Sequence, residues 1–201
     1  MKTLALDGIR ILNMCFIGPG ALCSEMLSDL GADVIRISDI HPEGLSALPL
    51  MVFDEWPGLR NCRTFSVNLR MEAGREVFKD LTKSADVMME GSRPGVSRRL
   101  GIDYDTMKAI NPRIVYAALT AYGQDGPYQD IPGHELNCVA ISGLLDLTGL
   151  KGGMPAIPGS LVAAWSGGLS AAVGILAALV ARQRTGKGQF LDVSVTDAIT
   201  E

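Results

Sequence analysis

The sequence is poor in aromatic residues and in groups that bind metals. Aromatic side chains make up 5% of the 201 residues, and there are two histidines, His41 and His134. The four cysteines are scattered, so none forms a Cys-x-x-Cys pair or stands at metal-ligand spacing from a histidine. This pattern argues against a disulfide framework or a zinc motif. It predicts reduced thiols, no bound metal and a cytoplasmic location.

An excess of positive charge is also missing. The net charge is −4 and the pI is near 5.2, which argues against a partner that is a nucleic acid. Arginines nevertheless cluster at 60–70 and at 93–99. A local basic patch in an acidic protein is typical of a site for a phosphorylated small molecule, and the alternative for each arginine is a solvated surface.

Long apolar runs are limited to one stretch. No sustained apolar run stands at the N-terminus, so a signal peptide is not expected. Residues 161–181 have the length of a membrane span, but about half of them are Ala, Gly or Ser. Such small residues permit close approach of backbones. The stretch is therefore predicted to be a central helix packed under a sheet, with no membrane as partner.

Strand-like and helix-like segments alternate along the chain. Strands are predicted at 9–15, 32–37, 63–69, 86–89, 114–119 and 189–195, and helices at 21–30, 72–83, 96–100, 104–110 and 161–181. In the helix at 72–83, Val77, Phe78 and Leu81 are expected to face inward. Alternation of this kind predicts an α/β fold, a Rossmann-like parallel sheet with flanking helices and right-handed crossovers.

A long loop leads from the strand at 114–119 to a segment of helical periodicity after residue 135. Glycines and prolines at 123, 126, 127, 132 and 133 mark it as irregular. His134 is therefore expected at the carboxyl edge of the sheet, where ligands collect in open α/β folds. The residue pattern leaves two interpretations open: a catalytic base, or a loop histidine that satisfies local hydrogen bonds.

An ordered set of short motifs resembles the family III CoA-transferases, the CaiB/BaiF type. They are Ile-Gly-Pro-Gly at 17–20, Leu-Gly-Ala-Asp-Val-Ile-Arg at 30–36, Glu-Gly at 90–91 with Arg-Pro-Gly-Val at 93–96, Arg-Leu-Gly at 99–101, Tyr-Gly-Gln at 122–124 with Gly-Pro at 126–127, Gly-His-Glu-Leu-Asn at 133–137, and Arg-Thr-Gly-Lys-Gly-Gln at 184–189. Each is weak alone, whereas the ordered set is specific. The element at 133–137 is similar to the α-methylacyl-CoA racemase branch.

The resemblance implies a large Rossmann-like domain and a small domain in an interlocked dimer. Family members are roughly twice as long as this chain, beyond a usual single domain. Residues 1–201 are therefore expected to be the N-terminal part of the large CoA-binding domain, without the small domain and the C-terminal return segment. The implied partners are acyl-CoA and a second family member, in a homodimer or a heterodimer.

Coenzyme A, as an acyl-CoA thioester, is the substrate that the resemblance implies. Arginines can bind its phosphates through two parallel hydrogen bonds. The family usually has an acid at the position of Asn68 and a lysine at that of Arg70. The positions that match the CoA contacts are Arg36, Val67, Asn68, Leu69, Arg70, Gly91, Ser92, Arg93, Arg99, Gly133, Glu135, Leu136, Asn137 and Cys138.

Racemisation of a 2-methylacyl-CoA requires a group on each face of the α-carbon: one takes the proton and another returns it. In the enzymes that the chain resembles these are a histidine and an aspartate, and His134 matches the histidine. Counting forward from His134 places the aspartate at Ala164, and counting back from Gly174 and Ile175 places it at Ala163. Neither is acidic. The same aspartate is the nucleophile in the transferase branch, so both mechanisms are affected.

Three interpretations follow from the resemblance. The chain is an acyl-CoA racemase or related CoA enzyme, in which His134 is the base and another acid or an altered reaction replaces the aspartate. Alternatively, it is a CoA-binding subunit of a heteromeric CoA-transferase with little activity alone. The third interpretation is an Asp-to-Ala variant or a truncated member of the family. Whether the chain is itself an enzyme stays open at this point.

Overall fold

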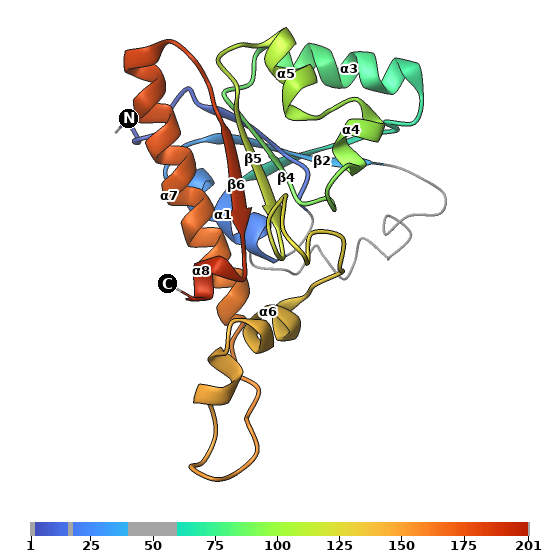
Figure 1. Ribbon diagram of the computed structural model, residues 1–201. Helices are drawn as coiled ribbons and strands as arrows, with labels where there is room; N and C mark the ends of the chain where they lie inside the picture. The colour runs from blue at the N-terminus through green and yellow to red at the C-terminus, as the bar shows by residue number, and fades with distance from the viewer. Residues whose placement is uncertain (1–2, 16–17, 40–59, 201) are drawn as a thin grey trace.

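A computed structural model describes residues 3–15, 18–39 and 60–200 of the chain. His41 and Ile17, the first residue of the motif at 17–20, lie outside these ranges. Six strands and the helices that flank them account for most of the described residues, and the two described ends of the chain both lie beside the longest helix (Figure 1).

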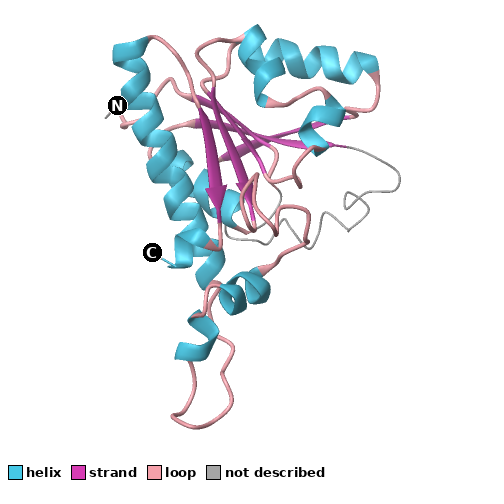
Figure 2. Cartoon of the chain, viewed as in Figure 1, coloured by secondary structure: helices cyan, strands magenta, loops and turns pink. Residues whose placement is uncertain are grey.

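A six-stranded parallel sheet forms the centre of the described structure (Figure 2). The strands, in the spatial order β3-β2-β1-β4-β5-β6, are β3 (Cys62–Val67), β2 (Asp33–Asp39), β1 (Arg10–Asn13), β4 (Val87–Glu90), β5 (Val115–Thr120) and β6 (Phe190–Ser194). Every neighbouring pair is parallel. The predicted α/β fold with a Rossmann-like parallel sheet is confirmed. Its strand order reverses between β1 and β4, the switch point at which ligands bind in open α/β sheets.

Helices cover both faces of the sheet and continue beyond one end of its strands (Figure 1). They are α1 (Pro19–Asp29), α3 (Glu72–Lys83), α4 (Val96–Leu100), α5 (Tyr104–Ile110), α6 (Glu135–Ile141), the 3-10 helix η3 (Leu144–Leu147), α7 (Val162–Thr185) and α8 (Asp197–Thr200). The predicted bounds of α3, α4 and α5 agree with the structure, because their capping and periodicity signals are local.

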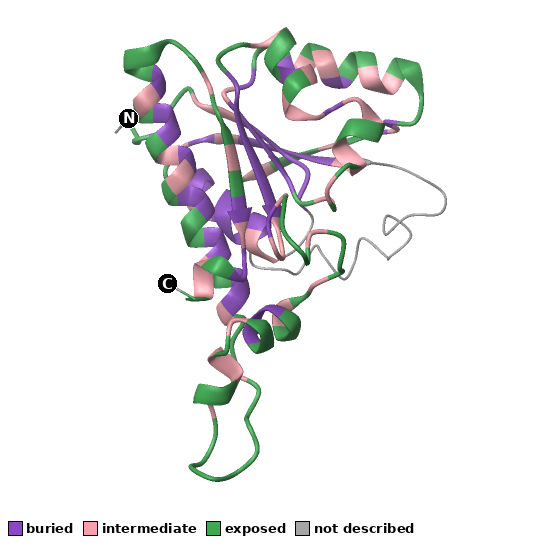
Figure 3. Ribbon diagram, in the orientation of Figure 1, coloured by how far each residue is buried: buried purple, intermediate pink, exposed green. Residues whose placement is uncertain are grey.

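Alternate residues of the central strands enter two separate cores. Ile11 of β1 packs with residues of α1 and α7, whereas the next residue, Leu12, packs with Phe78 of α3 and Met107 of α5. Side chains on successive strand positions point to opposite faces, so a strand buried on both sides reads as a continuous apolar run. Figure 3 shows the result: the central strands are buried, whereas the edge strand β6 is partly exposed.

The predicted inward position of Val77 is wrong. Phe78 is fully buried, whereas Val77 is 45% exposed. The reason is that α3 packs beside β3, and among the described residues β3 is the edge strand, so no further described strand covers the side of the helix that carries Val77. A hydrophobic residue on an amphipathic helix can therefore remain at the rim of the core.

The long apolar helix α7 packs against α1 and the sheet, as predicted. By length and composition it could also cross a membrane, and half of its apolar window is buried inside the protein. Gly167 and Gly168 face α1: a Cβ built on Gly168 would lie 2.8 Å from the carbonyl oxygen of Pro19. These two glycines therefore let the helix backbones approach closely, which a larger side chain would prevent.

The close contact of α7 with α1 gives a prediction for two matched glycine substitutions. Gly168→Ala should destabilise the protein, because overpacking of about 1–3 kcal/mol exceeds the gain in helix propensity of about 1 kcal/mol. Gly174→Ala lies on the same helix, but its Cβ would meet nothing closer than a Leu191 methyl group at 3.6 Å, so it should stabilise. Urea unfolding curves of both variants test this. Equal shifts in the same direction would contradict the packing described here.

Candidate active site

A cavity of about 680 Å³ opens at the carboxyl ends of the strands that flank the switch point. One part of its lining comes from the last residues of β5 and from the residues that directly follow β1 and β4. They are Met14, Cys15, Gly91, Ser92, Leu119 and Thr120. Its walls come from the start of α1, the loop before α6 and the first turn of α7. The volume lies within the range of small-molecule sites, and its lining combines apolar groups with a few polar ones.

The cavity brings together nine of the residues singled out in the sequence. Gly91, Ser92 and Arg93 come from the loop after β4, and His134 lies opposite at the start of α6. The complete set is Gly91, Ser92, Arg93, Gly133, His134, Glu135, Cys138, Ala163 and Ala164. The predicted position of His134, where the loop after a strand meets a helix at the carboxyl edge of the sheet, agrees with the structure.

The backbone around His134 is fixed by its neighbours. His134 is the N-cap residue of α6, and its N–H donates to Asn137 Oδ1 at 3.0 Å. Its carbonyl oxygen accepts the N–H of Cys138 at 3.1 Å. A Cβ on the preceding Gly133 would lie 2.5 Å from the Cβ of Ala121, so only glycine fits there. The imidazole, which is on an exposed residue, is thus presented to the cavity from a well-defined backbone.

Glu135 makes a contact that the sequence did not reveal. Its Oε1 accepts the N–H of Ala163 at 2.7 Å, and its Oε2 accepts the N–H of Ala164 at 2.9 Å. The N-cap residue of α7, Leu161, provides no side-chain acceptor. Since the first N–H groups of a helix need partners from outside the helix, Glu135 caps α7 from a neighbouring element. The resemblance assigns Glu135 to CoA, whereas here its carboxylate binds protein.

Both candidate positions for the family aspartate lie in the first turn of α7 and line the cavity. Ala163 is fully buried and Ala164 is 5% exposed. Neither supplies a carboxylate. Among the described residues that line the cavity, Glu135 alone carries one.

The other residues that the resemblance assigns to CoA do not line this cavity. Arg70 and Arg99 are exposed on the surface, as are Leu136 and Asn137 on the outer side of α6. Arg36 is 8% exposed and Leu69 is fully buried. Leu69 is therefore not accessible to a ligand in this conformation, and its carbonyl oxygen accepts a hydrogen bond from Arg75 Nη1 at 3.1 Å.

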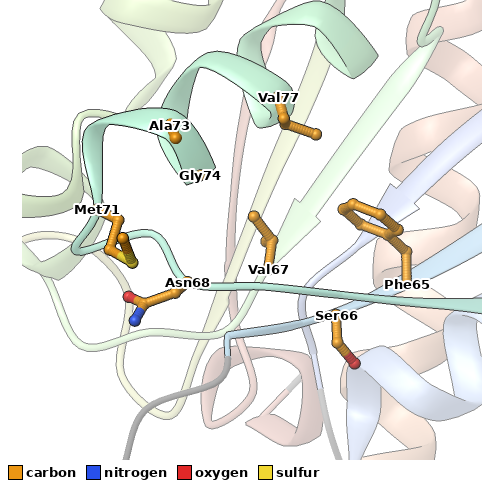
Figure 4. A pocket seen from close by; sticks show the side chains of 8 residues that line it. All are labelled: Phe65, Ser66, Val67, Asn68, Met71, Ala73, Gly74 and Val77. Atoms are coloured by element: carbon orange, nitrogen blue, oxygen red, sulfur yellow. The ribbon is translucent and has the colours of Figure 1, made fainter.

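Val67 and Asn68 line a second, shallow pocket of about 340 Å³ between β3 and α3 (Figure 4). Phe65, Val67 and Val77 give it an apolar surface. Asn68 Oδ1 accepts the N–H of Arg70 at 3.0 Å, which fixes the start of the following loop. The CoA-contact positions are therefore distributed between this pocket, the cavity and the surface.

Two buried groups at the strand ends were missed in the sequence. Cys15 lines the cavity, and burial raises the pKa of its thiol well above the usual value, with a further contribution from the charge of Glu90. Glu90 is 2% exposed, and its Oε2 accepts the N–H of Ser92 at 2.7 Å. Burial raises the pKa of the Glu90 carboxyl group. Each residue stands directly after an apolar strand sequence. That position, at the carboxyl end of a strand, is the sequence feature that could have identified them as site residues.

In the part of the chain that the structure describes, no three His, Cys, Asp or Glu side chains are close enough together to bind a metal ion.

The raised pKa of Glu90 gives a pH-dependent prediction. A raised pKa in the folded state means that this carboxyl group favours folding at low pH, and that the contribution is lost as pH rises through the folded-state value. Glu90→Gln cannot ionise and keeps an acceptor for Ser92. Its unfolding free energy, relative to the parent protein, should therefore increase between pH 5 and pH 8, as followed by denaturant titration at each pH.

Glu72→Gln is the matched control with the opposite sign. A hydrogen bond from Arg75 lowers the pKa of the exposed Glu72, so its ionised form favours folding above the ordinary carboxyl range. The variant should lose stability relative to the parent as pH rises from about 3 to about 5, and the difference should then stay constant up to pH 8. If the difference in unfolding free energy between Glu90→Gln and the parent did not change with pH, the raised pKa assigned to the buried Glu90 would be contradicted.

Comparison with known proteins places this geometry in a family. The family model described as CoA-transferase family III matches residues 6–201. A succinyl-CoA–L-malate CoA-transferase beta subunit from Chloroflexus aurantiacus is 36% identical over 98% of this chain and 50% of its own length. Human α-methylacyl-CoA racemase is 34% identical over 96% of this chain and 49% of its own length.

A solved structure supports the same assignment. The crystal structure of a CaiB/BaiF family protein from Brucella suis has a TM-score of 0.88 and 32% identity, over 99% of this chain and 55% of that one. The chain spans about half the length of the curated relatives it matches. With the family model matching almost the whole chain, this protein belongs to CoA-transferase family III.

Proposed function

We propose that this protein acts on acyl-CoA thioesters and that His134 removes the proton α to the thioester carbonyl. The observation that carries the proposal is the position of His134, which faces the cavity at the switch point together with Arg93. A thioester in the cavity would have the imidazole on one side and a guanidinium group within the same lining. Family membership supports CoA thioesters as the substrate class.

Removal of the α-proton and its return on the opposite face require different groups. The α-proton of a thioester is weakly acidic, so its removal needs a positioned base and donors for the enolate oxygen. His134 is the cavity residue suited to the first task. Exchange of the α-proton with solvent needs only this base, whereas inversion of configuration needs a second group on the opposite face. Neither Ala163 nor Ala164 can supply that group.

Binding of CoA would extend from the cavity to the surface. Arg93 lies in the cavity lining, and Arg70 and Arg99 are exposed where phosphates could reach them. Guanidinium groups suit phosphates because two N–H groups of one side chain can donate to two phosphate oxygens. The apolar pocket beside Asn68 would suit a flat part of the nucleotide.

A second candidate function is that of a CoA-binding subunit that depends on a partner for turnover. The alanines at 163 and 164 favour it, because they remove the acid of the racemase reaction and the nucleophile of the transferase reaction. One relative is itself the beta subunit of a CoA-transferase. An Asp-to-Ala variant or a truncated member of the family is the third candidate.

A dimer, with a second copy or with another family member, is part of this proposal. The segment from the last residue of η3 to the start of α7 extends away from the sheet (Figure 1) and carries strongly exposed apolar residues. Leu147, Leu150 and Met154 are more than four-fifths exposed, at 82%, 86% and 88%. Burial of such side chains by another chain would be favourable.

The proton-transfer proposal predicts deuterium uptake at the α-carbon of a 2-methylacyl-CoA in deuterated water. Uptake by the parent protein should fall about 100-fold or more in His134→Ala, in keeping with the usual contribution of a general base. Mass spectrometry of the recovered thioester measures the exchange. No uptake by the parent protein despite binding, measured by calorimetry, would reject catalysis and favour the CoA-binding subunit.

A second variant separates the remaining candidates in the same assay. Ala164→Asp supplies a carboxylate at one of the two aspartate positions, and Ala163→Asp at the other. Racemisation or acyl transfer that appears in only one of the two variants would favour the Asp-to-Ala interpretation. It would also show which of the two positions corresponds to the family aspartate. Exchange without inversion in the parent, followed by inversion in the variant, would support His134 as the base on one face.

The CoA site predicts that Arg93→Ala weakens binding of CoA by about 1–3 kcal/mol, the usual loss for a hydrogen bond to a charged group. Arg113→Ala is the matched control: it removes the same charge near Gly186, before β5, at the opposite edge of the sheet. Calorimetry at one salt concentration should show a much smaller effect for the control. Equal losses in both variants would mean that only the overall charge matters.

A further inference from the structure

We infer that Glu135 is the positioning residue of this site: its carboxylate fixes the start of α6, and with it His134, against the start of α7. The catalytic consequence of this inference rests on the proposed function. The contact itself rests on the two hydrogen bonds to Ala163 and Ala164, at 2.7 Å and 2.9 Å.

The contact between Glu135 and the start of α7 uses both oxygens of the carboxylate. Each carboxylate oxygen accepts one backbone N–H, so both acceptors are used in a bidentate arrangement. α7 is 24 residues long and has no acidic residue in its own first turn. The negative charge that favours the N-terminus of this helix therefore comes from Glu135, through the attraction between a carboxylate and the helix dipole.

His134 depends on this contact because Glu135 ties the first turn of the short helix α6 to α7. The helix has seven residues, a length that is marginal without tertiary contacts. Cys138 and Val139 pack with Ala163 and Val195 on its inner side, whereas Leu136 is 44% exposed. Glu135 is the direct neighbour of His134. Without its carboxylate, the first turn of α6 can shift relative to α7, and a base displaced by about 1 Å loses much of its effect.

The length and the charge of the side chain both matter. Aspartate is one methylene shorter, so its carboxylate keeps the charge but cannot reach both N–H groups without movement of α6. Glutamine has the right length, but it has one acceptor oxygen, and its amide group would point a donor at a donor. We therefore expect Glu135→Asp and Glu135→Gln to lie between the parent protein and Glu135→Ala.

The imidazole signals of His134 provide a test that does not require turnover. The chain has two histidines, so a His41→Gln background leaves one set of imidazole signals in the NMR spectrum. In Glu135→Ala these signals should broaden or move toward those of a free side chain, and hydrogen exchange of the Ala163 and Ala164 amides should accelerate about tenfold or more. Asp103→Ala, which removes the cap of α5 outside the cavity, should change neither.

The catalytic consequence is read from α-deuterium uptake and CoA affinity together. Glu135→Ala should lower the exchange rate about 10- to 100-fold with little change in the affinity for CoA, and Glu135→Asp should recover part of the rate. Unchanged imidazole signals and unchanged amide exchange in Glu135→Ala would overturn the inference. If the parent protein shows no uptake, the proposed function fails, and the NMR measurements still decide the positioning role. Should Glu135→Ala not fold, the Gln and Asp variants serve for the same measurements.

Discussion

The reversal of strand order between β1 and β4 is the constraint on which the rest of the structure depends. Parallel strands joined by right-handed crossovers place α1 on one face of the sheet and α3 on the other. The loops that leave β1 and β4 therefore diverge, and a crevice opens between them. His134 reaches this crevice because β5 lies next to β4 and its long loop returns across the strand ends.

Small residues keep the crevice open and its walls close together. A Cβ on Gly20 would lie 2.1 Å from the Cβ of Cys15, so glycine is required there, whereas one on Gly91 would make an ordinary contact with the Cys15 Sγ at 3.4 Å. The start of α1 and the end of β4 can thus both approach the Cys15 thiol. The same principle operates outside the crevice, where Gly168 lets α7 approach α1. Burial beside these walls explains why the Cys15 thiol and the Glu90 carboxyl group have raised pKa values.

Most of the fold could be predicted from the sequence because its signals are local, and the contacts within the site could not. Periodicity and glycine punctuation located the sheet, α3 and the loop that carries His134. The bond from Glu135 to Ala163 joins residues 28 positions apart, and it depends on where α7 begins. No periodicity reports such a contact. Burial of Glu90 was likewise hidden, because a strand sequence does not show which of its ends is covered.

Because Glu135 caps α7, the start of this helix does not depend on an acidic side chain at position 163 or 164. An aspartate at position 163 or 164 could itself place negative charge near the N-terminus of that helix. Here Glu135 already supplies this charge and binds the N–H groups of both residues, so alanine at either position leaves the helix start satisfied. An aspartate is therefore not needed at either position to satisfy the start of α7. The helix start and the wall of the cavity can form with alanine at both positions.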